Sequence, residues 1–404
     1  MPRPSLAYQE ALAWLYGLQR FGIKLGLENI EHLLEELSQM DALQARRSTA
    51  GIVVPGNVIH VAGTNGKGSV CAMIDSICRA KGYRTGLFVS PHLVTFRERI
   101  RVNGEMISKD AVVAGLTTIR NLVAHWNPHP TFFEVVTALA LKHFADAKVE
   151  IAVLETGLGG RLDATNAVQS NVSVITPIDF DHEKWLGKTI TEIAAEKAGI
   201  IKPGIPVVCA PQRAEAEEVI RARAAKCGAP VQFVSGSYGE ASIALAGSHQ
   251  KQNAALAIAA VRAANINIDA SSVAHGLSCI EWPARFQKWD ERTIIDGAHN
   301  PAAARLLAKT WREIFDEERA TLVVAILSDK NLRGICEALV PISETVLLPK
   351  IRSERAADPK ELADVLAGIN PRLPCCITPN ISNALSLARG KPNPILITGS
   401  LHFA

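Results

Sequence analysis

The residues best suited to chemistry form a glycine-rich loop that follows a short apolar run, Val-Ile-His-Val, at residues 58–61. Glycines without a Cβ atom let backbone N–H groups approach an anion closely. Lys67 adds a point charge for β- and γ-phosphates, and the hydroxyl of Ser69 is suited to Mg²⁺. The pattern predicts a nucleoside triphosphate site made of Gly63, Thr64, Asn65, Gly66, Lys67, Gly68 and Ser69.

This loop departs from the usual GxxxxGK[ST] pattern, because Val61 replaces the first glycine and Gly68 separates Lys67 from Ser69. The alternative is a plain glycine turn with a surface lysine. The apolar strand before the loop, the helix predicted from Ser69 to about Lys81, the lysine and the hydroxyl together favour phosphate binding.

A second polar segment, Glu155 to Asn166, follows the apolar run 151–154. Ligands of open α/β sheets gather at the carboxyl ends of strands, which places Glu155 well for Mg²⁺. Its glycines allow close approach of a substrate, and Arg161 and Asp163 are candidate substrate-binding residues. The alternative is a strand-ending acid followed by a flexible turn.

Two further residues follow strands or helices of the same region. His182 comes after the predicted strand 172–176, which favours a metal ligand over a structural histidine. Lys197 ends the predicted helix 189–198, and its spacing alone indicates an ordinary surface lysine.

Polar residues also gather near residues 249–301. The set includes Asn253. Arg285 could clamp a phosphate or carboxylate, Asp296 could accept hydrogen bonds from a ribose, and His299 could contact phosphate oxygens. Pro301 follows as the start of a predicted helix, 301–315. A salt-bridged hinge with a helix cap explains the same residues, and spacing does not separate the two interpretations.

The elements that must position these residues fall into two alternating series. Helical spacing of leucines marks residues 6–40, interrupted by a loop at 21–28. Strands are predicted at 58–61, 86–89, 151–154, 172–176 and 207–210, and then at 293–296, 322–327, 345–348 and 395–398. Because helix-like segments separate most of them, we predict mostly parallel sheets in two domains, 1–282 and 283–404.

The bulk composition narrows the class of protein. The chain has 404 residues, 48% hydrophobic, with a net charge of +3, which does not indicate nucleic acid or membrane binding. The eight cysteines show no zinc spacing and indicate thiols in a reducing compartment. No signal peptide or membrane span is evident, so we expect a cytoplasmic enzyme.

Taken together, the ordered motifs resemble the folylpolyglutamate synthase/dihydrofolate synthase family of the Mur ligase superfamily. The matching segments are 24–28, 63–69, 90–93 with 97–99, 133–134, 155–166, 181–182 with 185–187, 196–199, 285–287, 296–301 and 398–401. The resemblance implies an N-terminal P-loop ATPase-like domain with a mostly parallel sheet and a smaller, Rossmann-like C-terminal α/β domain. It implies ATP-dependent joining of L-glutamate to a pteroate or folate carboxylate through an acyl phosphate.

The resemblance also implies roles for single residues. Lys67 and its loop would hold the phosphates, and Lys197 matches a lysine that the superfamily carbamylates. The implied Mg²⁺ ligands are Ser69, Ser90, Glu155 and His182. ATP contacts would come from Asn253, Arg285 and Asp296, with His299 near the phosphates; Lys24, Leu25, Gly26, Phe133 and Glu134 would lie near the pterin. Lys67, Lys197 and His299 are thus the implied catalytic residues, in an enzyme that is commonly monomeric.

Three departures from the family and three alternatives stay open. Ala284 replaces a usual glycine, Asp329-Lys330-Asn331 replaces Asp-Lys-Asp, and the chain ends at Ala404 where relatives usually continue into a final helix. A Mur-type muropeptide ligase, a P-loop kinase or NTPase, and an ATP-binding regulatory module are the alternatives. The sequence leaves open whether dihydropteroate, a folate that already carries glutamate, or both accept the glutamate.

Overall fold

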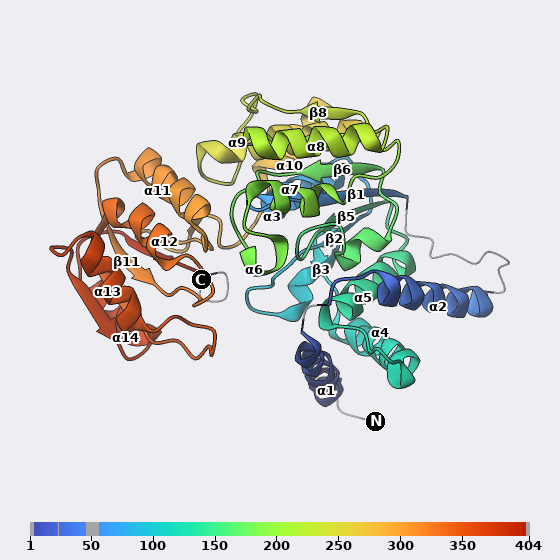
Figure 1. Cartoon of the computed structure of the whole chain (residues 1–404), viewed down its shortest axis with the longest axis horizontal. Helices are drawn as coiled ribbons and strands as arrows, with labels where there is room; N and C mark the ends of the chain where they lie inside the picture. The colour runs from blue at the N-terminus through green and yellow to red at the C-terminus, as the bar shows by residue number, and fades with distance from the viewer. Residues whose placement is uncertain (1–3, 23, 46–55, 401–404) are drawn as a thin grey trace. The chain divides into compact units, whose positions relative to one another are not determined.

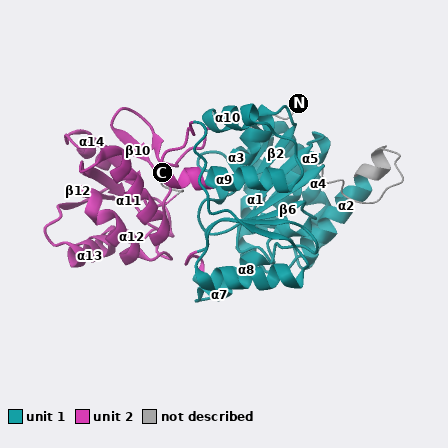
Figure 2. Cartoon of the chain, turned by 90° about the horizontal axis from the view of Figure 1, so that it is seen from above, with its two compact units in different colours: residues 1–178, 183–241, 253–279 teal, residues 179–182, 242–252, 280–404 magenta. Residues whose placement is uncertain are grey.

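The structure is a computed structural model that describes residues 4–22, 24–45 and 56–400. It contains two compact units, coloured separately in Figure 2. Unit 1 comprises residues 1–178, 183–241 and 253–279, and unit 2 comprises 179–182, 242–252 and 280–404. Two short segments that precede residue 280 therefore belong to unit 2 by their contacts. The domain junction predicted after residue 282 stays a prediction.

Unit 1 is built on an eight-stranded sheet with the strand order β4-β3-β2-β5-β1-β6-β7-β8. The strands are β1 Asn57–Ala62, β2 Thr85–Phe88, β3 Ile100–Val102, β4 Glu105–Met106, β5 Ile151–Glu155, β6 Val172–Ile175, β7 Val207–Cys209 and β8 Val231–Phe233. The neighbouring strands β2, β5, β1, β6, β7 and β8 run parallel. Strands β3 and β4 pair antiparallel at one edge of the sheet. The ends of β2, β5, β1 and β6 therefore lie side by side.

Helices surround this sheet (Figure 1). They are α1 Pro4–Gly17, α2 Glu28–Ala45, α3 Lys67–Ala80, α4 Lys109–Leu122, α5 Phe132–Asp146, α6 Glu183–Leu186, α7 Ile190–Ala198, α8 Ala214–Lys226, α9 Ser248–Ala263 and α10 Ala270–Ser278, with short 3₁₀ turns η1 Leu18–Phe21, η2 Phe96–Arg99, η3 Val123–His125 and η4 Ala164–Ala167. The first five residues of α9 count with unit 2. None of the described helices is long and apolar enough to cross a bilayer.

The core of unit 1 explains why its central strands are continuous apolar runs. Every residue of β5 is buried, because helices cover both faces of a parallel sheet. One cluster packs Leu15 of α1 and Leu139 of α5 near Leu154. Another packs Ile193 of α7 and Ile220 of α8 with strand residues of β6 and β7. The sheet thus gives a rigid edge for the polar loops that follow its strands.

Unit 2 has a six-stranded sheet with the order β13-β12-β11-β14-β10-β9. Its elements are β9 Gln287–Lys288, β10 Thr293–Ile295, α11 Pro301–Phe315, β11 Ala320–Val324, α12 Leu332–Leu339, η5 Val340–Ile342, β12 Ser343–Pro349, α13 Pro359–Ile369, β13 Cys375–Thr378, α14 Ile381–Arg389 and β14 Ile395–Thr398. All strands are parallel except β9, and Trp311 is fully buried in the core. The predicted fold class, α/β with two mostly parallel sheets, is confirmed.

Candidate active site

The loop after β1 has a conformation that requires glycine. Gly63 has φ of +144°, and a Cβ atom there would lie 1.9 Å from Thr176 Oγ1. The backbone N–H groups of Thr64 and Asn65 donate to the carbonyl of Pro177, at 3.0 and 3.2 Å. The loop is therefore tied to the end of the neighbouring strand β6, which fixes its position at the edge of the sheet.

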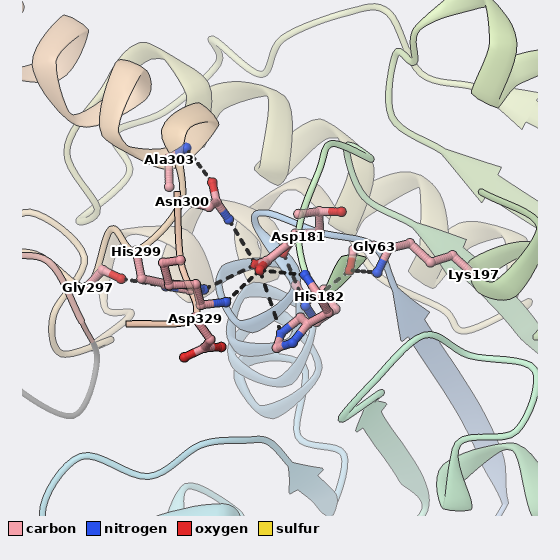
Figure 3. Close-up of polar contacts among 12 residues, drawn as sticks. Gly63, Asp181, His182, Lys197, Gly297, His299, Asn300, Ala303 and Asp329 are labelled. Carbon is pink, nitrogen blue, oxygen red and sulfur yellow. Dashed lines mark hydrogen bonds and ion pairs between the residues drawn. The ribbon is translucent and has the colours of Figure 1, made fainter. Parts of the chain in front are cut away.

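Two lysine side chains converge on this loop. Lys67 Nζ donates to the carbonyls of Gly63, at 3.1 Å, and Thr64, at 3.2 Å. Lys197 Nζ, on a residue only 4% exposed, donates to the same Gly63 carbonyl at 2.8 Å (Figure 3). The spacing-based interpretation of Lys197 as a surface lysine is wrong, because the end of α7 is buried against the loop. Two ammonium groups on one carbonyl oxygen suit a polyanion.

The start of α3 completes this anion site. Gly66 is its N-cap, with φ of +89°, and a Cβ atom there would lie 3.0 Å from Asn253 Oδ1. Asn253 of α9 therefore stands against the loop, as a predicted nucleotide contact should. Ser69 is buried in the first turn of α3, where the helix dipole favours anions.

Carboxylate and hydroxyl residues lie at the ends of the adjacent strands. Glu155 ends β5, is 5% exposed, and accepts a hydrogen bond at Oε2 from the backbone N–H of Ser90 after β2, at 3.1 Å. No group of three or more His, Cys, Asp or Glu side chains that could hold a metal occurs among the described residues. One carboxylate with hydroxyls fits Mg²⁺, which usually keeps waters and takes phosphate oxygens.

The segment after β5 is held by its own carboxylate. Asp163 accepts hydrogen bonds from Leu158 N at 2.8 Å and from Thr165 N and Oγ1 at 3.1 and 2.5 Å. Burial raises the pKa of Asp163, although these hydrogen bonds oppose the shift. Arg161 is more exposed and pairs with Glu196 at 2.8 Å. Asp163 shapes the loop in this structure, and its substrate role stays a prediction.

The predicted substrate residues near the N-terminus and α5 occupy two places. Lys24 donates to the carbonyl of His129 at 3.3 Å, and Leu25 and Gly26 follow it in the same loop. Glu134 closes the N-terminus of α5 by accepting from Thr131 N and Oγ1, at 2.6 and 2.7 Å. Phe133 packs on Gly157, where a Cβ atom would lie 2.4 Å from the ring. Phe133 thus meets the loop after β5.

Unit 2 contains the remaining predicted residues. Asp296 accepts from Phe286 N and Ala298 N, both at 2.8 Å, and burial raises its pKa against the opposing charge of Arg285. His299 Nδ1 lies 2.9 Å from the carbonyl of Gly297, which requires the proton on Nδ1. Asp296 and His299 therefore hold the turn between β10 and α11, and their nucleotide roles stay predictions.

Asp181 lies in the matching segment 181–182, but the sequence alone assigned it no role. Its carboxylate accepts from Lys330 Nζ at 2.6 Å. It also accepts from Asn300 Nδ2 at 3.1 Å and lies 3.5 Å from His299 Nε2 (Figure 3). Burial would raise its pKa, but the His299 hydrogen bond and the charges of His182 and Lys330 hold that pKa well below its usual range.

His182 belongs to the same segment and has φ of +53°. Its Nε2 atom lies 3.9 Å from Asp181 Oδ1. Among the predicted metal ligands, Ser69, Ser90 and Glu155 are residues of unit 1, whereas His182 is a residue of unit 2. The metal role of His182 stays a prediction.

Both parts of the chain match models of known domains. Residues 61–226 match the Mur ligase middle domain, and residues 284–401 match the glutamate ligase domain of Mur ligases. The first covers the glycine-rich loop after β1 and the segment after β5. The second begins next to Arg285.

Relatives along almost the whole chain agree with this. The dihydrofolate synthase/folylpolyglutamate synthase of Bacillus subtilis is 35% identical, over 98% of this chain and 97% of its own. A folylpolyglutamate synthase of Mycobacterium tuberculosis, complexed with ADP and AMPPCP, has a TM-score of 0.82 at 34% identity, covering 93% of this chain and 96% of its own. A bifunctional folylpolyglutamate synthase/dihydrofolate synthase with Mn, AMPPNP and L-glutamate bound has a TM-score of 0.84 at 29% identity, covering 97% and 96%. The chain belongs to the dihydrofolate synthase/folylpolyglutamate synthase family of the Mur ligases.

Proposed function

We propose that this chain is a bifunctional dihydrofolate synthase/folylpolyglutamate synthase. It uses ATP and Mg²⁺ to join L-glutamate to the carboxylate of dihydropteroate or of a reduced folate. The observation that carries the proposal is the position of Lys67, which bonds two carbonyls of its own loop beside the buried Lys197. The B. subtilis relative, named for both activities, supports the bifunctional assignment.

The chemistry follows from the poor reactivity of a carboxylate. An oxygen of the acceptor carboxylate takes the γ-phosphoryl group as the bond to ADP breaks, and the glutamate amine then displaces phosphate from the acyl phosphate. Lys67 and the N–H groups in the first turn of α3 stabilise charge on the transferring group. Bound Mg²⁺, held by Ser69, Ser90, Glu155 and His182, would neutralise phosphate charge.

The other candidate residues take supporting roles in this proposal. Asn253, Arg285 and Asp296 contact ATP, and His299 contacts its phosphates. Lys197, whose ammonium group is buried beside the loop, is the residue at which CO₂ would add to the neutral amine, with loss of a proton, to give a carbamate that could serve as an anionic metal ligand. Lys24, Leu25, Gly26, Phe133, Glu134, Arg161 and Asp163 surround the acceptor. The enzyme acts as a cytoplasmic monomer on small molecules, without a nucleic acid or membrane partner.

Phosphate release by the purified chain with Mg-ATP and L-glutamate tests this function. Dihydropteroate and a reduced folate serve as alternative acceptors, and we expect release with both. Release with only one acceptor would restrict the chain to that single activity. Turnover that depends on neither glutamate nor an acceptor would instead identify an NTPase.

A further inference from the structure

Arg99 is a buried cation to which the proposed function assigns no role. It ends η2, between strands β2 and β3, and is 8% exposed. Its backbone carbonyl accepts from Val89 N at 3.0 Å, next to Ser90 and the end of β2. The side chain therefore belongs to the part of the sheet edge that carries Ser90 and Glu155.

Side chains on two sides orient the guanidinium of Arg99. Its Nε donates to Nδ1 of His92 at 2.7 Å, which requires the imidazole proton on Nε2, 3.4 Å from the hydroxyl of Tyr16. The guanidinium carbon lies 5.5 Å from the ring centre of Phe132, on which Tyr16 stacks. These contacts use one nitrogen and one face of the guanidinium, and they leave its terminal nitrogens unbonded.

The carboxylates around Arg99 do not neutralise it. The charges of Glu155 and Glu98 act on the guanidinium of Arg99. Neither carboxylate, nor any other in the described part of the chain, forms an ion pair with it. Glu98 instead accepts from the backbone N–H groups of three residues at 2.6–2.9 Å: Leu93, Val94 and Thr95. Glu155 accepts from Ser90 N.

The terminal nitrogens of Arg99 make no hydrogen bond within the described part of the chain, and neither is sealed from solvent. Burial lowers the pKa of Arg99 to about 10, against the opposing effect of Tyr16 and Glu155. A buried cation without a counter-ion is costly, so an anionic ligand that completes the site would be stabilised.

We propose that Arg99 binds the carboxylate of the acceptor that is to be phosphorylated. This inference rests on the proposed function. The guanidinium fork matches a planar carboxylate, and Phe132 provides apolar surface beside it for an aromatic acceptor. Glu155, at the metal side, lies close enough to act on the same guanidinium. While one carboxylate oxygen takes the phosphoryl group, the other stays hydrogen-bonded to Arg99 and becomes the carbonyl oxygen.

Binding of dihydropteroate and of its carboxamide, measured without ATP, tests the proposal directly. The wild-type chain should bind the carboxylate about 10- to 100-fold more tightly than the neutral amide. Arg99→Gln should abolish that preference while leaving affinity for AMPPCP unchanged. The matched control is Arg97→Gln in the same η2, because Arg97 donates to the backbone carbonyls of Ile107 and Met106; it should keep the preference.

The acceptor preference of the Arg99→Gln variant supports or overturns the proposed role of Arg99. If Arg99→Gln keeps the wild-type preference, or if the wild type shows none, the proposal is wrong. If Arg99→Gln does not fold, Arg99→Lys decides in its place, since a point charge without the fork should retain only part of the preference. Failure of the proposed function is separate, because it shows as absent glutamate-dependent turnover in the wild type, whereas this test reads acceptor binding alone.

Discussion

The two units differ in the groups that their polar lysine side chains contact. In unit 1, Lys67 bonds only neutral carbonyls of its own loop among the described residues. In unit 2, Lys330 bonds the buried carboxylate of Asp181, and both side chains are less than 10% exposed. A neutral carbonyl leaves most of a lysine's charge for a ligand, whereas a carboxylate cancels it.

This difference separates a binding site from a structural connection. The charge on Lys67 is available to phosphates that arrive from outside. The charge on Lys330 holds segment 179–182 to the loop before α12, while Asn300 ties the same carboxylate to the start of α11. The two lysines should therefore respond differently to substitution, one in catalysis and the other in stability.

The largest expected effect follows removal of the cation in unit 2. Lys330→Met leaves the Asp181 carboxylate buried without its counter-ion, which should lower the free energy of unfolding by about 3–5 kcal/mol. Urea unfolding measures the change. Adding Asp181→Asn should recover most of the loss. Lys309→Met is the control, because its pair with Glu313 is exposed and spans 3.8 Å. A loss below about 1 kcal/mol for Lys330→Met would contradict the structural role.

In unit 1 the corresponding change should affect turnover instead. Lys67→Ala removes the positive charge that stabilises the transferring phosphoryl group. Glutamate-dependent phosphate release should therefore fall by about 10²- to 10³-fold. The control is Lys81→Ala at the other end of α3, where the lysine pairs with Asp269. Normal ligation by Lys67→Ala would remove the basis of the proposed function. Equal slowing by both variants would show that α3 matters only as a scaffold.

A smaller effect, on the pH dependence of stability, should come from the buried His60 of unit 1. His60 Nε2 lies 2.7 Å from Thr165 Oγ1, and burial lowers the pKa of His60 to about 3. The folded state then binds fewer protons than the unfolded state between pH 6.5 and about 3, so stability falls as the pH falls through this window. His60→Gln should flatten the slope by about 1 kcal/mol per pH unit.

Unfolding by urea at pH 5, 6 and 7 measures this slope. His125→Gln, which removes an exposed imidazole, is the matched control. A slope that His60→Gln leaves unchanged would show that folding does not lower the pKa of His60. Because the pKa of Asp181 is instead held below its usual range, its contribution to unit 2 should be lost only at pH values below about 4.

Local pattern was enough to predict most elements. The strand before the glycine-rich loop, the helix after it and the helix 301–315 all form, because apolar runs and caps act within a few residues. The missed strands β3, β4, β8, β9 and β13 are two to four residues long and lie at or next to an edge of a sheet. Of their side chains only Ile100 and Thr378 are buried. Such strands depend on their neighbours more than on their own residues.

The site was predictable only where its residues share a motif. Asp181 and Lys330 are 149 positions apart, and no local spacing indicates that they meet. Lys197 resembles a surface lysine until the fold buries it against Gly63. The resemblance supplied its expected role, but the contact itself comes from how α7 packs. Likewise, no local pattern indicates that Arg99 is buried without a nearby counter-ion, because this depends on the fold.

The smallest expected effect concerns Ala284, a position where the family resemblance leads us to expect glycine. Ala284 has φ of +55° and is 1% exposed, and its carbonyl accepts from Gly297 N at 2.9 Å. Ala284→Gly relieves about 1–2 kcal/mol of left-handed strain. It also loses a buried methyl group, worth about 0.8 kcal/mol, and adds about 0.4–1 kcal/mol of unfolded-state entropy. The net change in stability should therefore stay within about 1 kcal/mol of zero.

Ala308→Gly is the matched comparison, because Ala308 is also buried but lies in the middle of α11. There the lost methyl group and the lower helix propensity of glycine add, so the variant should lose about 1.5–2 kcal/mol. Thermal or urea unfolding compares the two. Equal losses would mean that the backbone at Ala284 is not strained. A loss confined to Ala308→Gly would show that relief of left-handed strain at Ala284 offsets the lost methyl group and the added unfolded-state entropy.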